Sequence, residues 1–321
     1  MKKTGWLCLL VFLAVQGSAV ADNYPSKSIK IVVPYPAGGP ADQRSRQIAA
    51  KLAKAVGQAV VVENRPGASG AIGASAVAKA PPDGYTLLWG TLYDLAINSA
   101  VNLALGYDPL RDFAPITQAN SSYLVLNAWP GLGVNSMKEL IALAKAKPGQ
   151  LNCGSSGNAT APHFALEVLN RSANIDITHV PFKGDAPLLT DLVGGHVDIG
   201  FNVTTTALPH VKAGKLVPLA VSSPKRLAPF SEVPTVAELG FPEMEITLWA
   251  GVLAPAGTPA QIIKRLNTEL VKIINSPEIR EQWISGGAEA VPTTPEEFAA
   301  FIQSEQARWS RLIKQTGVKM E

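Results

Sequence analysis

Three glycine-rich loops combine free backbone amides with small polar side chains, the groups that bind an anion without a fixed positive charge. They span residues 34–42 (PYPAGGPAD), 64–73 (NRPGASGAIG) and 153–160 (CGSSGNAT). Glycine lets the backbone approach a ligand closely, and the N–H groups of a helix's first turn attract negative charge. The chemistry we expect is capture of a carboxylate, with loops 34–42 and 153–160 holding it from two sides.

Other interpretations of these loops stay open. A tight turn between a strand and a helix uses glycine whether or not a ligand binds there. Asp42 either caps the helix that follows or contacts the ligand, since aspartate favours the start of a helix. Arg65 is expected in a surface salt bridge rather than at the anion.

The spacing of the candidate residues argues against nucleotide binding and catalysis. Gly67, Gly70 and Gly73 form G-x-x-G-x-x-G, not the dinucleotide pattern G-x-G-x-x-G, and no P-loop lysine follows them. The run 154–157 (GSSG) misses the G-x-S-x-G nucleophile elbow by one residue. The histidines at 163, 179, 196 and 210 lack metal-binding spacing. We therefore expect no enzyme activity, no cofactor and no metal ion.

Cys153 and His163 have the residue types of a catalytic pair. Cys153 ends an apolar run, so we interpret it as a small buried hydrophobic residue rather than a nucleophile. His163 follows Pro162 in the first turn of a predicted helix, a position from which a side chain can face a ligand cleft.

The composition is that of a globular protein without a nucleic-acid surface. Of 321 residues, 47% are hydrophobic and 17% charged, enough to bury a large core. Lys2 and Lys3 lie in the first 21 residues, so the remainder carries 26 basic and 25 acidic residues. That balance provides no basic stripe for phosphates, and the length suggests two domains.

Residues 1–21 have the pattern of a secretory signal peptide. Two lysines precede the apolar run 6–15 (WLCLLVFLAV), and residues 19–21 (AVA) form the cleavage signature before Asp22. A retained N-terminal anchor is the alternative. No later stretch reaches 18 apolar residues, so we expect export to the periplasm with the signal peptide removed.

Short apolar runs alternate with helical patterns along the rest of the chain. Predicted strands include 29–33, 60–62, 85–89, 123–126, 150–153, 177–180, 197–201, 216–221 and 248–253. Predicted helices include 43–56, 137–145, 159–169, 188–193, 259–274 and 295–313. This alternation predicts parallel sheets in an α/β architecture. No linker separates the halves, so the chain is expected to cross between two domains more than once and to leave a cleft.

Eight stretches together resemble the extracytoplasmic solute receptors of tripartite tricarboxylate transporters, also called the Bug family. They are VPYPAGGPAD (33–42), VVENRPGASGAIGA (61–74), PPDGYTLL (81–88), LGYDPLRDFAPIT (105–117), CGSSGNATAPH (153–163), HVPFKGDAPLLTDLVGGHVDIGF (179–201), LPHVKAGKLVPLAV (208–221) and GVLAPAGTP (251–259). They follow one another over nearly the whole chain after residue 21, so the resemblance is specific.

The resemblance implies a type II periplasmic-binding-protein fold, in which two α/β domains are joined by two crossing hinge strands around a cleft. The crossing strands are expected at 123–128 and 248–254. Domain 1 is then 22–125 plus 251–321, and domain 2 is 126–250.

The resemblance also implies a set of ligand-binding residues, which hold a carboxylate through backbone amides, hydroxyls and ordered water. From the first loop it takes Tyr35, Ala37, Gly38, Gly39 and Ala41; from the third, Ser155, Ser156, Gly157, Ala159 and Thr160. Asp42 and His163 join this set as candidates from their own positions at the starts of predicted helices. Ala68, Ser69, Asp198 and Phe201 are additional contacts. The chain departs from the pattern at Tyr35, at Ala37 and in residues 91–94 (TLYD), where Tyr93 or Asp94 would admit an aromatic acid or an amino group.

The function implied is that of a monomeric periplasmic receptor. It would bind a di- or tricarboxylate or an aromatic carboxylate and deliver it to the membrane permease of a tripartite tricarboxylate transporter. A periplasmic partner of a signalling receptor would use the same site and is the alternative. A hydrolase using Ser155 or Ser156 is a weaker alternative, because the nucleophile elbow is missing.

Overall fold

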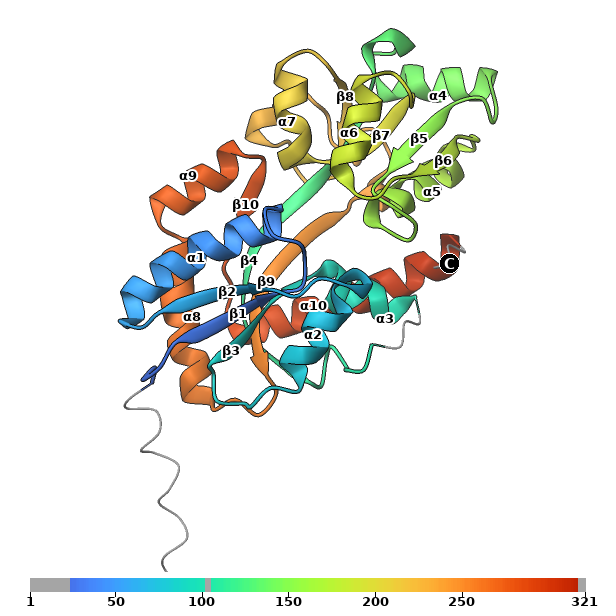
Figure 1. Ribbon diagram of the computed structural model, residues 1–321. Coiled ribbons are helices and arrows are strands. Elements are labelled where there is room, and N and C mark those ends of the chain that lie inside the picture. Colours follow the sequence, from blue (N-terminus) through green and yellow to red (C-terminus); the bar gives the residue numbers. More distant parts are fainter. Residues whose placement is uncertain (1–23, 102–104, 317–321) are drawn as a thin grey trace, which may run out of the picture.

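The computed structural model describes residues 24–101 and 105–316. The predicted signal peptide, residues 1–21, therefore lies outside the described residues. Figure 1 shows two groups of helices and strands, joined by two long strands that run between them. Within the described ranges, no helix is both long enough and apolar enough to cross a membrane.

In the part of the chain that the structure describes, ten strands form one continuous hydrogen-bonded sheet. Eight of them follow the order β2-β1-β3-β9-β4-β7-β5-β6, and β8 and β10 also pair with β4. The strands are β1 (Ile29–Val33), β2 (Val60–Asn64), β3 (Thr86–Thr91), β4 (Phe113–Ala128), β5 (Asn152–Ser155), β6 (Thr178–Pro181), β7 (Ile199–Val203), β8 (Val217–Val221), β9 (Thr247–Pro255) and β10 (Ala288–Ala290).

The helices follow the predicted pattern and add several that the periodicity did not indicate. They are α1 (Pro40–Val56), α2 (Ala71–Ala78), α3 (Asn98–Ala100), α4 (Met137–Ala146), α5 (Ala161–Ala173), α6 (Asp185–Val193), α7 (Thr204–Lys212), α8 (Ala260–Ile274), α9 (Pro277–Ser285) and α10 (Pro295–Thr316). In α1, Pro40 occupies the first turn, and Gly57 ends the helix in the left-handed conformation at φ 69°.

β4 runs through both halves of this sheet, which we call the first sheet and the second sheet. Its residues 113–123 pair with β9, and its residues 124–128 pair with β7. The first sheet contains β1, β2, β3, β9 and β10, and the second contains β5, β6, β7 and β8. Nearly every residue of β4 is buried, because helices or neighbouring strands cover it along its length.

The predicted α/β architecture is confirmed, and the sheets predicted as parallel also contain antiparallel pairs. β1, β2 and β3 are parallel, as are β5, β6 and β7. In contrast, β4 is antiparallel to β9, β7 and β8. The reason is the course of the chain, which leaves the first sheet through β4 and returns to it through β9 in the opposite direction.

Helix α10 packs on both parts of the molecule. It begins beside β4 of the first sheet and reaches α5, where the rings of Trp309 and Phe164 meet at 5.4 Å between centroids (Figure 1). Trp249 and Trp309 both donate their indole N–H to Glu305, at 3.0 and 3.3 Å. This buried contact fixes Trp249, a residue of β9 that also forms a wall of the cavity described next.

Candidate functional site

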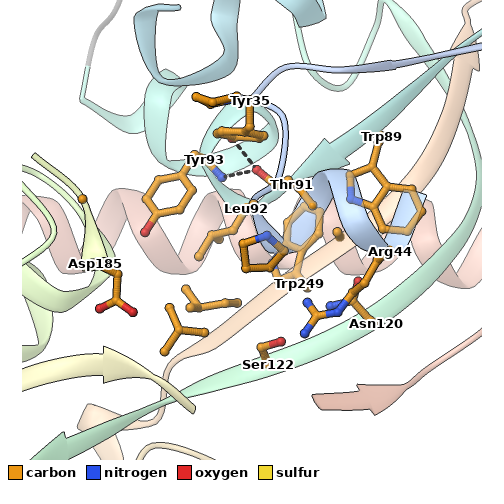
Figure 2. Close-up of a pocket in the computed structure, with 18 of the residues that line it drawn as sticks. Tyr35, Arg44, Trp89, Thr91, Leu92, Tyr93, Asn120, Ser122, Asp185 and Trp249 are labelled. Carbon is orange, nitrogen blue, oxygen red and sulfur yellow. Dashed lines mark hydrogen bonds between the residues drawn. The ribbon is translucent and has the colours of Figure 1, made fainter. Parts of the chain in front are cut away.

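A cavity of about 540 Å³ lies between the first sheet and the N-terminal end of α6. Its lining consists of residues 35–37, 39–41, 44, 89, 91–93, 120, 122, 183–187, 203 and 248–250. Four aromatic side chains, Tyr35, Trp89, Tyr93 and Trp249, form much of the wall (Figure 2). An apolar cavity with a few polar groups is the usual form of a small-molecule site.

The first wall is the loop between β1 and α1, which holds Tyr35 in a fixed position. The Tyr35 hydroxyl donates to Asp94 Oδ1 at 2.8 Å and lies 2.7 Å from Thr91 Oγ1. Asp94 also accepts from the Thr91 hydroxyl at 2.6 Å and the Thr91 backbone N–H at 3.0 Å. Burial raises the pKa of Asp94 to about 6, despite these hydrogen bonds.

The second wall is the segment of residues 183–187, which comprises the end of the loop after β6 and the first turn of α6. Asp185 lies at the start of α6, and its carboxylate accepts hydrogen bonds from Asn202 Nδ2 at 3.1 Å and from the Thr206 hydroxyl. Burial raises the pKa of this carboxyl above its ordinary value. The cavity therefore has an oriented acidic group on the side of the second sheet.

Unpartnered polar atoms lie on the opposite side, on the strands of the first sheet. Asn120 and Ser122, two residues apart on β4, project to the same face of the sheet. Asn120 Oδ1, Ser122 Oγ and the indole Nε1 of Trp89 are buried and have no hydrogen-bond partner within residues 24–101 and 105–316. Buried polar atoms nearly always have a partner, so three orphans around one cavity point to an absent ligand or water.

Arg44 brings a positive charge to the same side of the cavity from α1. No described carboxylate forms an ion pair with it, and no hydrogen bond from its guanidinium to a described residue is present. Burial alone lowers the pKa of Arg44 to about 10, so the side chain stays charged at neutral pH. Arg44 is half-buried, and a cation in such a place without an acidic partner favours binding of an anionic ligand.

Tyr93, which lines the cavity, connects the first sheet with the start of α5. It lies in a π-helical turn (residues 93–97) that follows β3, and its hydroxyl accepts a hydrogen bond from the backbone N–H of Ala161, the first residue of α5. Burial raises the pKa of Tyr93 to about 12. Of residues 91–94, where the chain departs from the family pattern, the first three line the cavity, and Asp94 bonds to two lining residues, Tyr35 and Thr91.

The structure brings part of the first predicted loop to the cavity. Tyr35, Ala37, Gly39 and Ala41 line it. Two other predicted residues of this loop do not line it, because they bond to each other: Asp42 Oδ2 accepts from the Gly38 backbone N–H at 2.9 Å. Asp42 Oδ1 accepts from Arg46 Nε at 2.9 Å, which lowers the pKa of Asp42 to about 2. Asp42 thus has local partners at the start of α1, but the N-cap residue of this helix is Gly39 and no side chain caps it. Contact of Asp42 with a ligand stays a prediction.

The third predicted loop lies outside the cavity lining. None of Ser155, Ser156, Gly157, Ala159, Thr160 and His163 lines it. The Ser155 hydroxyl donates to Gly157 O at 3.0 Å and lies 2.6 Å from His179 Nε2, while His163 Nδ1 accepts from the Ala159 N–H at 3.1 Å. These bonds close the loop on itself. Contact between this loop and a ligand stays a prediction.

The Ser155–His179 pair has the residue types of a nucleophile and its base, but not the access. Ser155 is fully buried and lies outside the cavity lining. The ring of His179 stacks on that of His163 at 3.7 Å between centroids, and burial together with that neighbour lowers the pKa of His179 to about 4. The pair therefore holds the loop and lies outside the lining of this cavity.

The four additional contacts that the family pattern implied also lie elsewhere. Phe201 packs in the hydrophobic core, and Asp198 accepts from the Asn152 backbone N–H at 2.8 Å, which ties β7 to β5. Ala68 and Ser69 form the turn before α2, and Asn98 Nδ2 donates to Ser69 O at 2.9 Å. These four positions have structural partners, and their contact with a ligand stays a prediction.

Sequence analysis missed Arg44, Asn120, Ser122 and the loop 183–187. That loop is a fourth strand–glycine–helix segment (KGDAP), so the signal used for the other three loops was present. Asn120 and Ser122 gave no such signal, because they lie inside a long strand. Among the described residues, no three His, Cys, Asp or Glu side chains are placed to hold a metal ion.

The comparisons with known proteins agree with one another. Residues 45–318 match the model of the tripartite tricarboxylate transporter family receptor. Protein BugT of Bordetella pertussis is 36% identical over 315 residues, which cover 97% of each chain.

Two solved structures from Rhodopseudomonas palustris have the same fold. Rpa4515, determined with adipate, superimposes with a TM-score of 0.84 at 37% identity and covers 92% of this chain and 99% of that one. MatC, with bound malate, gives a TM-score of 0.78 at 31% identity over 90% of this chain and 100% of that one. The chain therefore belongs to the tripartite tricarboxylate transporter receptor family, whose members are periplasmic solute-binding proteins of the two-domain α/β type and not enzymes.

Proposed function

We propose that this protein binds a small carboxylate in the 540 Å³ cavity and delivers it to the membrane subunits of a tripartite tricarboxylate transporter. The observation that carries the proposal is Arg44, a half-buried residue whose guanidinium lines the cavity without an acidic partner among the described residues. A carboxylate supplies the missing charge and accepts two parallel N–H bonds from a guanidinium. The adipate and malate of the two related structures are carboxylates as well.

The body of the ligand is apolar and is compatible with an aromatic ring. Tyr35, Leu92, Tyr93 and Trp249 offer flat or aliphatic surfaces around the centre of the cavity (Figure 2). Aromatic side chains gain from burying a ring at offset or edge-on geometry, beyond the area that is removed from water. An aromatic carboxylate therefore fits these walls better than a fully polar tricarboxylate.

Binding is coupled to closure of two domains in a monomer. The domains are 22–125 plus 251–321 and 126–250, and β4 and β9 are the connections between them. The cavity walls come from both segments, so a ligand adds contacts that stabilise the closed form. Small-angle scattering at saturating ligand should show one protomer that becomes more compact. An unchanged radius of gyration contradicts closure.

We expect residues 1–21 to direct export and to be removed from the exported protein. The mature protein in a periplasmic fraction is expected to begin at Asp22, which intact-mass measurement tests directly. A periplasmic or membrane-bound product that retains residues 1–21 contradicts cleavage.

A thermal-shift screen followed by calorimetry tests ligand binding. The panel contains succinate, adipate, malate, citrate, benzoate and 4-hydroxybenzoate. A ligand at 100 times its Kd adds about 2.7 kcal/mol of stability, which raises the Tm of a protein of this size by roughly 4 °C. Arg44→Gln should remove the shift, whereas Arg65→Gln should keep it, because Arg65 is an exposed residue paired with Glu63. A panel without any binder contradicts the proposal.

Delivery is tested in cells that express the permease. Deletion of the receptor gene should abolish uptake of the ligand found in the screen, and the wild-type gene should restore it. Normal uptake combined with loss of a transcriptional response to the ligand would contradict delivery and support the sensory alternative.

A further inference from the structure

We propose that the cavity is polarised and selects a monocarboxylate whose far end donates a hydrogen bond, such as a hydroxy- or amino-substituted aromatic acid, over a dicarboxylate. This inference rests on the proposed function, since it assigns the two ends of the same ligand. Figure 2 shows the arrangement: Arg44, Asn120 and Ser122 lie on one side of the cavity, Asp185 lies across from them, and Leu92 lies between.

The positive end of the cavity has the hydrogen-bond donors that a carboxylate needs. Arg44 provides a fork of N–H donors, and the Ser122 hydroxyl and the Trp89 indole N–H are further donors without partners. The residues Trp89, Asn120 and Ser122 are 0%, 2% and 2% exposed, so bulk water does not satisfy their polar atoms. Asn120 Oδ1 is an acceptor, and we expect it to accept a hydrogen bond from the Arg44 guanidinium when a ligand is bound.

The negative end is equally well fixed. Asn202 and Thr206 hold the two carboxylate oxygens of Asp185, so the group is oriented and cannot turn away without loss of these bonds. The negative charge of Asp185 reaches the Tyr93 hydroxyl and, together with burial as the larger cause, raises the pKa of Tyr93. Lys183 lines the same end, but it is exposed, and water screens its charge.

This distribution of charge separates ligand classes. A second carboxylate at the far end would face Asp185 across a largely apolar cavity, and the two like charges would repel each other. A hydroxyl or an ammonium at that end donates to Asp185 instead, and the bond to a charged acceptor is stronger than one between neutral groups. One end of the cavity therefore binds an anionic group and the other a hydrogen-bond donor, and an apolar part of the ligand lies between them.

Calorimetry on the full mature chain tests the inference with ligands matched in length. The aromatic set is 4-hydroxybenzoate, 4-aminobenzoate, benzoate and terephthalate, and the aliphatic pair is 6-aminohexanoate and adipate. For the wild type we expect the best donor-bearing acid of either set to bind at least tenfold tighter than its dicarboxylate counterpart. Benzoate, without a donor, should bind more weakly than 4-hydroxybenzoate.

Two variants assign the ends. Asp185→Asn keeps the shape but removes the charge, so the preference for the donor-bearing acid over the dicarboxylate should fall at least tenfold, with a gain for terephthalate or adipate. Arg44→Gln should weaken all carboxylates at least tenfold and leave the preference between them unchanged. Circular dichroism checks folding, and Asp185→Ser serves if Asp185→Asn fails to fold.

The outcomes separate the two claims. Dicarboxylates that bind the wild type as tightly as their donor-bearing counterparts, or a preference unaffected by Asp185→Asn and Asp185→Ser, overturn the polarity while carboxylate binding stands. Failure of every carboxylate to bind overturns both. Binding that survives Arg44→Gln in full shows that the acid group lies elsewhere and overturns the assignment of the positive end.

Discussion

The Tyr93 hydroxyl accepts a hydrogen bond from the backbone N–H of Ala161, with 3.4 Å between the two atoms. Tyr93 follows β3 of the first sheet, and Ala161 begins α5, which packs on the second sheet. A single side chain in the cavity wall thus joins the two parts of the molecule beside the ligand site. The third glycine-rich loop, which ends at Thr160, is attached to the cavity through this bond.

Tyr93→Phe should weaken ligand binding about two- to tenfold, because a neutral hydrogen bond contributes about 0.5–1.5 kcal/mol and this one stabilises the closed form. Calorimetry with the best ligand of the screen measures the change. The matched control is Tyr85→Phe, at the far end of the first sheet, where the hydroxyl bonds to Ser26. Equal affinities for Tyr93→Phe and wild type contradict a role of this bond in closure.

Asp94 should make the protein less stable as pH rises towards neutrality. Burial raises its pKa from 3.8 to about 6, so the folded state binds the proton more tightly than the unfolded chain does. The resulting stability is complete below pH 3.8 and is lost as pH rises through 6. Relative to Asp94→Asn, the wild type should lose about 2 to 3 kcal/mol between pH 3 and pH 7, measured by urea unfolding. A difference independent of pH means that Asp94 titrates normally.

Asp42 should behave in the opposite way. Its bond to Arg46 lowers its pKa from 3.8 to about 2, so its contribution is complete above pH 3.8 and is lost as pH falls through 2. Arg46 is 51% exposed, and water screens the pair, so the contribution is about 1 kcal/mol. The stability advantage of the wild type over Asp42→Asn should shrink by that amount from pH 5 to pH 2. An advantage that grows in acid would contradict the pairing.

Cys153→Ser should lower stability and leave ligand binding within a few-fold of the wild type. Cys153 is fully buried on β5 and outside the cavity, and burial raises the pKa of its thiol. A serine hydroxyl in the same apolar place costs about 1–3 kcal/mol of unfolding free energy. In the wild type, a thiol reagent should react only on unfolding. Rapid reaction of the native protein, or a tenfold loss of affinity in a folded variant, contradicts this assignment.

Much of the fold could be read from the sequence, because local signals specify it. The apolar run 29–33 is β1 with the predicted bounds, and α1 stops at Gly57, where only a glycine takes the left-handed conformation easily. The burial of Cys153 followed from its place in an apolar run. The alternation of strands and helices indicated the α/β architecture, and the resemblance of eight stretches identified the correct family.

Other features of the fold depend on long-range pairing. The strand predicted at residues 123–126 extends from Phe113 to Ala128, and its polar residues 118–122 lie in a strand only because β9 pairs with them across 130 residues of sequence. Local periodicity carries no information about such a partner. The same pairing makes β4 and β9 antiparallel, which the alternation of strands and helices did not indicate.

The chemistry of the cavity was decided by tertiary structure alone. Arg44 and Arg46 are both arginines on α1, and the sequence does not distinguish them. Arg46 turns towards Asp42 and forms an ion pair, whereas Arg44 reaches the cavity, where no described carboxylate meets it. Asn120, Ser122 and Asp185 likewise acquire a role only because β4 and the start of α6 face the same space. Charge and hydrogen-bonding capacity belong to the residue type, but whether they are satisfied depends on neighbours that folding brings from distant parts of the chain.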